Sequence, residues 1–234
     1  MPELFQSSKL EMSLTPLESA AGAMMWGEYL TNRIAVILAL VLLLVELQDI
    51  IRLFPALLRC VPLWKGNMEL EHSVSMARTR NTVALVLALL LSIVIDRFAL
   101  LNPSWRALVP PAWQLGVTIG LIAAYAIVRR LFYLISPFRS KTAEFACTVR
   151  HTLYNYFILF AVLAVVTGVL LGAFKVPDGT VRAILWTEVA LAGFLSLLRT
   201  GQILRSRYGV FATILYLCAL EILPVGLLIL TCTK

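Results

Sequence analysis

Long blocks of apolar residues, separated by short polar connections, are the feature that most constrains the fold. About 20 residues, each rising about 1.5 Å, cross a ~30 Å hydrocarbon layer, so such blocks are typical of transmembrane helices. The composition agrees, since 60% of the 234 residues are hydrophobic and 14% are charged, whereas ordinary globular domains are about a quarter charged. We expect an all-α, polytopic membrane protein with six transmembrane helices, at residues 34–54, 82–101, 112–128, 153–174, 181–198 and 209–231.

The distribution of basic residues predicts how these spans are oriented. Thirteen of the 20 Lys and Arg residues lie in the loops after the first, third and fifth spans or at the adjoining span ends. Because basic loops tend to stay in the cytoplasm, we expect these loops to be cytoplasmic and both termini to lie outside. The net charge of +7 is then a property of the loops, and we expect a lipid bilayer rather than nucleic acid as the partner.

The predicted domain organisation is an outer tail, residues 1–33, followed by a single six-helix transmembrane domain, residues 34–231. Within the tail, the stretch Thr15-Pro16-Leu17-Glu18 fits a capping box with proline at the first helical position. A short helix on the outer leaflet is one interpretation, and a loosely ordered tail is the alternative. At the cytoplasmic end of the third span, Arg129 and Arg130 are expected to hold anionic lipid headgroups.

Acidic residues inside the predicted spans are the main functional signal. Ionisable groups are costly in hydrocarbon, by about 2.5–3.5 kcal/mol for Asp, Lys or Arg on insertion scales, and they usually face the bundle interior or a wet cavity. Spans five and six are joined by only ten residues, so we expect Glu188 and Glu221 to face each other. With Asp96 at the outer mouth, these acids are candidates for a proton- or cation-binding site in the outer half of the bundle.

Other charged and proline residues in the spans have simpler interpretations. Asp49 and Arg52, three residues apart on one helix face, predict a structural ion pair near the headgroups. Pro224 lacks an N–H and should kink the last span by freeing the carbonyl of Leu220. Glu221 could then be a neutral, hydrogen-bonded acid that stabilises the kink, which is the alternative to an ion-binding role.

Two G-x-x-x-G motifs predict close helix packing rather than chemistry. Gly116 and Gly120 lie in span three, and Gly168 and Gly172 lie in span four, all in the outer half. Since small residues let helices approach closely, we expect these two spans to meet there.

The sequence carries no recognisable catalytic or cofactor motif. The four cysteines lie far apart and form no C-x-x-C, and the two histidines fall on the cytoplasmic side. No H-E-x-x-H, G-x-S-x-G or Gly-rich phosphate loop is present. We therefore expect no metal, no cofactor and no enzymatic activity.

Two segments carry a resemblance to a known family. The stretch LYLCALEILP, residues 215–224, resembles the closing segment of a bacterial inner-membrane family described as a domain of unknown function, and TLYNYFILF, residues 152–160, is similar to its middle region. The resemblance covers about the C-terminal two-thirds of the chain. It implies an inner-membrane location and several helices, it implies no activity, and it singles out Tyr216, Glu221 and Pro224.

Two functions of different classes follow from these observations. The first is a non-enzymatic membrane subunit or scaffold, which packs against a larger inner-membrane assembly or a second copy and pairs its acids with arginines of its own chain or of a partner. The alternative is a proton- or cation-coupled transporter or channel that uses Glu221 and Glu188. A lipid-modifying membrane enzyme is a third alternative, although no nucleophile–base pair stands out.

Overall fold

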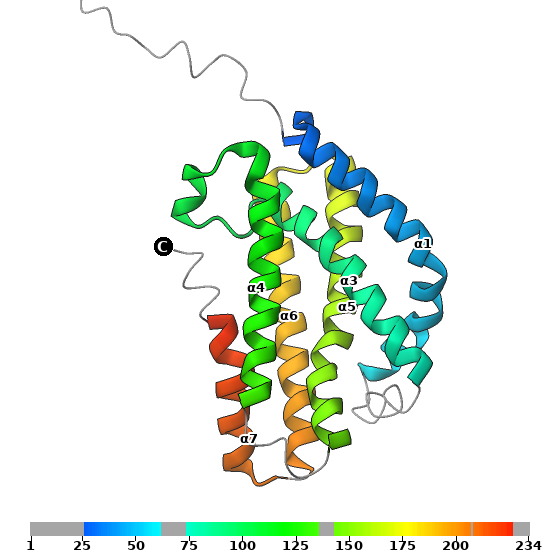
Figure 1. Cartoon of the computed structure of the whole chain (residues 1–234), viewed down its shortest axis with the longest axis vertical. Helices are drawn as coiled ribbons and strands as arrows, with labels where there is room; N and C mark the ends of the chain where they lie inside the picture. Colours follow the sequence, from blue (N-terminus) through cyan, green and yellow to red (C-terminus); the bar gives the residue numbers. More distant parts are fainter. Residues whose placement is uncertain (1–25, 62–73, 136–142, 207, 227–234) are drawn as a thin grey trace, which may run out of the picture.

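The structure is a bundle of long apolar helices. It is a computed structural model that describes residues 26–61, 74–135, 143–206 and 208–226 (Figure 1), and this part of the chain contains helices and no strand. Five helices are long and apolar enough to cross a membrane. The described residues therefore confirm the prediction of a helical chain with several helices that are long and apolar enough to cross a membrane.

The sixth span stays a prediction. The last apolar helix runs over Val210–Gly226 and is shorter than the other five, and the predicted span continues to residue 231, beyond the described residues. The predicted capping box in the outer tail also lies outside the described residues.

The five long helices overlap the first five predicted spans, and each extends beyond a predicted start or end, by as many as ten residues at the start of the fourth. In chain order they are the 3-10 helix η2 (Trp26–Glu28), α1 (Leu30–Cys60), α3 (Val74–Arg97), the 3-10 helices η3 (Ser104–Leu108) and η4 (Pro111–Trp113), α4 (Gln114–Ile135), α5 (Ala143–Ala173), α6 (Asp178–Arg205), α7 (Val210–Tyr216) and the π-helical η6 (Leu217–Ile222).

Three prolines directly precede helices in the described part of the chain. Pro103, Pro110 and Pro177 are the residues before η3, η4 and α6, respectively. Their fixed φ suits the turn into a helix, and their missing N–H costs nothing there. The connection between α5 and α6 is short, residues 174–177, whereas residues 98–113, which include η3 and η4, connect α3 to α4.

Helix α3 is the centre of the bundle. It packs against α1, α4 and α5, while α5 packs along α6. The main core forms where α1, α3, α5 and the start of α6 meet, around fully buried side chains such as Leu57, Leu87, Ile158 and Leu185. Helices α1 and α7 lie at opposite edges of the bundle (Figure 1).

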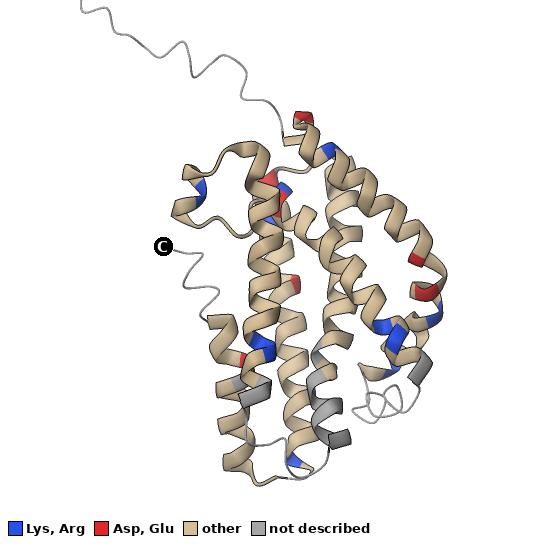
Figure 2. Cartoon of the chain, viewed as in Figure 1, with Lys and Arg blue, Asp and Glu red and all other residues tan. Residues whose placement is uncertain are grey.

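The outer surface is apolar over most of the length of the helices. Figure 2 shows few charged residues on the described helices, with long uncharged stretches between them. Helix α1 is the most exposed of the long helices, since only 6% of its most apolar 18-residue stretch is buried. Residues such as Leu44 and Val45 are about 70% exposed. Such a surface is stable only against lipid or another apolar partner.

Candidate functional site

A buried ion pair between α4 and η6 is the most unusual feature of the bundle. Arg129 Nη2 donates to Glu221 Oε1 over 2.8 Å. The two side chains are 7% and 4% exposed, respectively. A guanidinium and a carboxylate at this distance form a charge-assisted hydrogen bond that neutralises both charges. The pair therefore removes the cost of placing either charge alone inside the bundle.

This pair corrects the predicted role of Arg129. We expected Arg129 to lie at the membrane surface with Arg130 and to hold a lipid headgroup, because the third span was predicted to end at residue 128. Helix α4 continues to Ile135, so Arg129 lies more than one turn inside its end and its side chain faces the last helix. Arg130 is exposed, and a headgroup role for it stays a prediction.

Glu221 is presented to Arg129 by an irregular turn of the last helix. Residues Leu217–Ile222 are π-helical, and the N–H of Leu223 bonds to the carbonyl of Cys218, five residues back. The widened turn lies immediately before Pro224, whose ring and missing N–H cannot fit an ordinary helical turn. The kink predicted at Pro224 stays a prediction, and what the structure shows before this proline is a π turn, a feature that is frequent at functional sites.

Asp96, at the end of α3, is enclosed by a second buried cluster. Its Oδ1 accepts hydrogen bonds from Arg106 Nη2 at 2.6 Å and from Thr118 Oγ1 at 2.8 Å, and its Oδ2 accepts one from Trp26 Nε1 at 2.7 Å. Asp96 is 2% exposed. A carboxylate with three donors and a guanidinium partner is a structural cross-link, here between α3, α4, η2 and η3, rather than an open ion-binding mouth.

Glu188 has a different environment from Glu221. Its Oε1 accepts a hydrogen bond from Thr167 Oγ1 on α5 at 2.8 Å, and its Oε2 is shielded from solvent without a hydrogen-bond partner. Glu188 and Glu221 therefore do not form the expected facing pair. Glu188 is bonded to a hydroxyl on α5, and Glu221 is bonded to an arginine on α4.

The predicted ion pair of α1 is not formed. Among the ion pairs of the described residues, none joins Asp49 to Arg52, whose side chain is exposed. Spacing by three residues puts two side chains on one helix face but does not force contact, and an exposed pair contributes at most about 1 kcal/mol. On the same helix, Glu46 Oε2 is shielded from solvent without a hydrogen-bond partner.

The G-x-x-x-G glycines do not bring α4 and α5 together. A Cβ added at Gly116, Gly120 or Gly172 would meet nothing within 4 Å, so these positions face open space. Gly168 does pack closely, but against Val94 of α3 and Phe98, the residue after α3, whose side chains would lie 3.4 Å from its Cβ. The motif on α4 is thus left on the outside of the bundle.

Sequence reasoning missed the partners of the buried acids. Arg106 lies only ten residues after Asp96, in a short connection between antiparallel helices, and this proximity was an available signal. Arg129 and Glu221 are 92 residues apart, and nothing local in the sequence relates them. Likewise, nothing in the sequence indicated that Trp26 and Thr167 donate hydrogen bonds to Asp96 and Glu188, respectively.

Two of the acids in the described residues, Asp96 and Glu221, are paired with arginines. No group of three or more His, Cys, Asp or Glu side chains in the described part of the chain is arranged to hold a metal ion. Comparisons of the chain with family models, curated proteins and solved structures found no match. The resemblance of residues 215–224 to an inner-membrane family therefore stays a prediction.

Proposed function

We propose that this chain is a non-enzymatic integral membrane subunit or scaffold. In this proposal it crosses a bacterial inner membrane six times, with both termini outside. Its partner is a membrane protein or a second copy of the chain.

The observation that supports a scaffold is how the bundle neutralises its buried acids. Asp96 and Glu221 are each paired with an arginine of the same chain, at 2.6 and 2.8 Å. A carboxylate that carries protons or cations must exchange its partner during each cycle, and a buried guanidinium at contact distance competes with that exchange. Paired charges of this kind instead fix helices in place.

The outer surface supports a partner in the membrane. Helix α1 is mostly exposed along its length, and Gly116 and Gly120 leave an uncovered small-residue face on α4. In lipid, helices associate through close packing at such small residues, because lipid tails are as apolar as the side chains.

A proton- or cation-coupled transporter is the second candidate, and it depends on Glu188. This acid has a single hydroxyl donor and one shielded oxygen without a hydrogen-bond partner, so it lacks the neutralisation that Asp96 and Glu221 have. Ionisable residues inside membrane segments commonly mark ion pathways. The π turn that carries Glu221 adds to this alternative.

One preparation tests both functions. The chain is purified in mild detergent, the stoichiometry of co-purifying proteins is measured, and proton flux is followed in liposomes that contain the wild type or Glu188→Gln. The side-chain carbonyl of glutamine can still accept the hydrogen bond from the Thr167 hydroxyl, so this variant should keep the fold. A partner at fixed stoichiometry without flux supports the subunit, whereas flux that Glu188→Gln abolishes supports the transporter and overturns the subunit.

The orientation has its own test. Gly179, beside Asp178 at the start of α6, has nothing within 4 Å of an added Cβ, so Gly179→Cys in a cysteine-free background should not disturb the fold. A membrane-impermeant maleimide added to intact cells should label it. Labelling only after the cells are broken would show that this end of α6 lies in the cytoplasm, opposite to the proposed orientation.

A further inference from the structure

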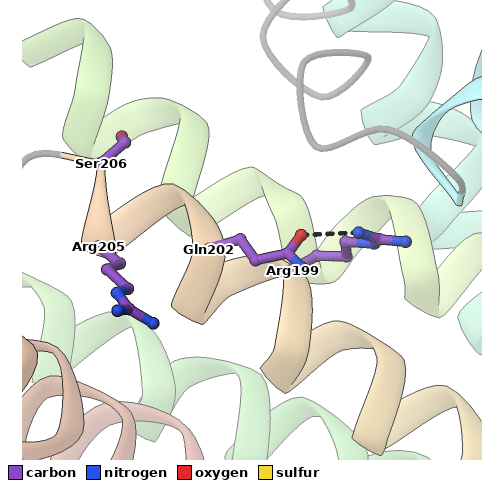
Figure 3. A pocket seen from close by; sticks show the side chains of 4 residues that line it. All are labelled: Arg199, Gln202, Arg205 and Ser206. Carbon is purple, nitrogen blue, oxygen red and sulfur yellow. Dashed lines mark hydrogen bonds between the residues drawn. The ribbon is translucent and has the colours of Figure 1, made fainter.

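A shallow hollow at the end of α6 is lined by two arginines, and no acid among the described residues forms an ion pair with either of them. Its lining residues are Arg199, Gln202, Arg205 and Ser206, and its volume is about 460 Å³ (Figure 3). None of the intramembrane acids lines it.

The guanidinium groups in this hollow have unused donors. Arg199 Nη1 donates to Gln202 Oε1 at 2.6 Å, while its Nε is shielded from solvent without a hydrogen-bond partner. Arg205 has no ion pair or hydrogen bond to any other residue in the described part of the chain, and Figure 3 shows its guanidinium extended from the helix. Guanidinium groups bind phosphate with fork-like geometry, so unused N–H groups at this position favour a phosphate oxygen as acceptor.

The position along α6 places this hollow at headgroup depth. Arg182 and Arg199 are 17 residues apart on one helix, which is about 26 Å at about 1.5 Å per residue. A hydrocarbon core of about 30 Å fits between these two arginines when both reach its edges. The last turn of α6, with Arg205, then projects into the headgroup layer.

We propose that the end of α6 binds the phosphates of anionic lipid headgroups through Arg199 and Arg205, whose side chains point in different directions (Figure 3). In the proposed orientation this end faces the cytoplasm, where the leaflet is negatively charged. The inference rests on the proposed membrane location and not on the choice between subunit and transporter. The competing explanation is that the arginines only complement the negative end of the helix dipole, which requires no ligand.

The test uses a photoactivatable phosphatidylglycerol analogue, with a phosphatidylcholine analogue for comparison, on the full chain in nanodiscs. Phosphatidylglycerol adducts should map to residues 199–206 and should outnumber phosphatidylcholine adducts. Arg205→Gln breaks no described contact, so it should fold normally and lower this labelling about five-fold, since each basic residue near an anionic surface is worth about 1 kcal/mol. Arg199→Gln should act in the same direction.

The matched control is Lys175→Gln, which removes one exposed positive charge at the opposite end of the bundle. It should leave the labelling of residues 199–206 unchanged. Equal labelling of wild type and Arg205→Gln, or equal labelling by the two lipids, would overturn the proposal. Loss of labelling in the presence of millimolar inorganic phosphate would assign the hollow to a soluble phosphate and overturn the lipid assignment. A chain that does not enter nanodiscs would refute the membrane location itself.

Discussion

Removing one partner of the Arg129–Glu221 pair should destabilise the bundle far more than removing both. Arg129→Met keeps an apolar stem in place but leaves the Glu221 carboxylate without its arginine in a site where the side chain is 4% exposed. Breaking a buried pair from one side typically costs about 3–5 kcal/mol, whereas replacing both members by apolar residues is often close to neutral. The double variant Arg129→Met with Glu221→Leu should therefore recover most of the loss.

The magnitude can be measured by equilibrium unfolding in mixed micelles, with circular dichroism as the readout of helix content. For a chain of 150–250 residues, about 1 kcal/mol corresponds to about 2–4 °C in Tm. The single variant should thus lower Tm by roughly 6–20 °C, and the double variant by much less.

An exposed pair in the same chain supplies the control. Arg97 and Asp178 lie 3.6 Å apart with side chains that are 45% and 59% exposed. Arg97→Gln should change the free energy of unfolding by at most about 1 kcal/mol. If Arg129→Met is no more destabilising than Arg97→Gln, or if the double variant is as unstable as the sum of its single changes, the pair does not stabilise this bundle.

Three further predictions concern neighbouring elements. Gly168→Leu should lower the free energy of unfolding by about 1–3 kcal/mol, because the new side chain overpacks against α3. Gly120 faces open space, so Gly120→Leu should not lower it. Equal effects of the two variants would contradict the packing of Gly168 against α3. Thr167→Val should cost about 1–3 kcal/mol by leaving Glu188 without its donor, and no loss would show that the hydroxyl is not needed. Pro224→Ala supplies an N–H and should slow amide hydrogen exchange in the π turn; unchanged exchange would mean that the proline does not cause the wide turn.

Helix positions were predictable because they depend on properties that are local in the sequence. Apolar length located five membrane-type helices. The end of α4 was misjudged because Arg129 and Arg130 were interpreted as surface anchors. An arginine can equally lie inside a bundle when a carboxylate meets it, and that depends on a distant segment.

The candidate site was only partly predictable for the same reason. The sequence identified Asp96, Glu188 and Glu221 as the acids to examine, since any ionisable group in an apolar block is unusual. It could not assign their partners, because helix rotation decides whether Glu221 meets Glu188 or Arg129, and rotation is set by packing of the whole bundle. Glycine spacing failed similarly, since a motif shows that close approach is possible but not which helix approaches.

The 92-residue separation of Arg129 and Glu221 has a consequence for biosynthesis. A ribosome completes α4 long before it makes η6, so Arg129 is inserted while its counter-charge has not yet been synthesised. Asp96 and Arg106, only ten residues apart, can neutralise each other as soon as their hairpin emerges. Arg129 therefore gains its carboxylate partner only when the segment that carries η6 has been made, and a chain that stops before η6 would keep Arg129 in the bundle without Glu221.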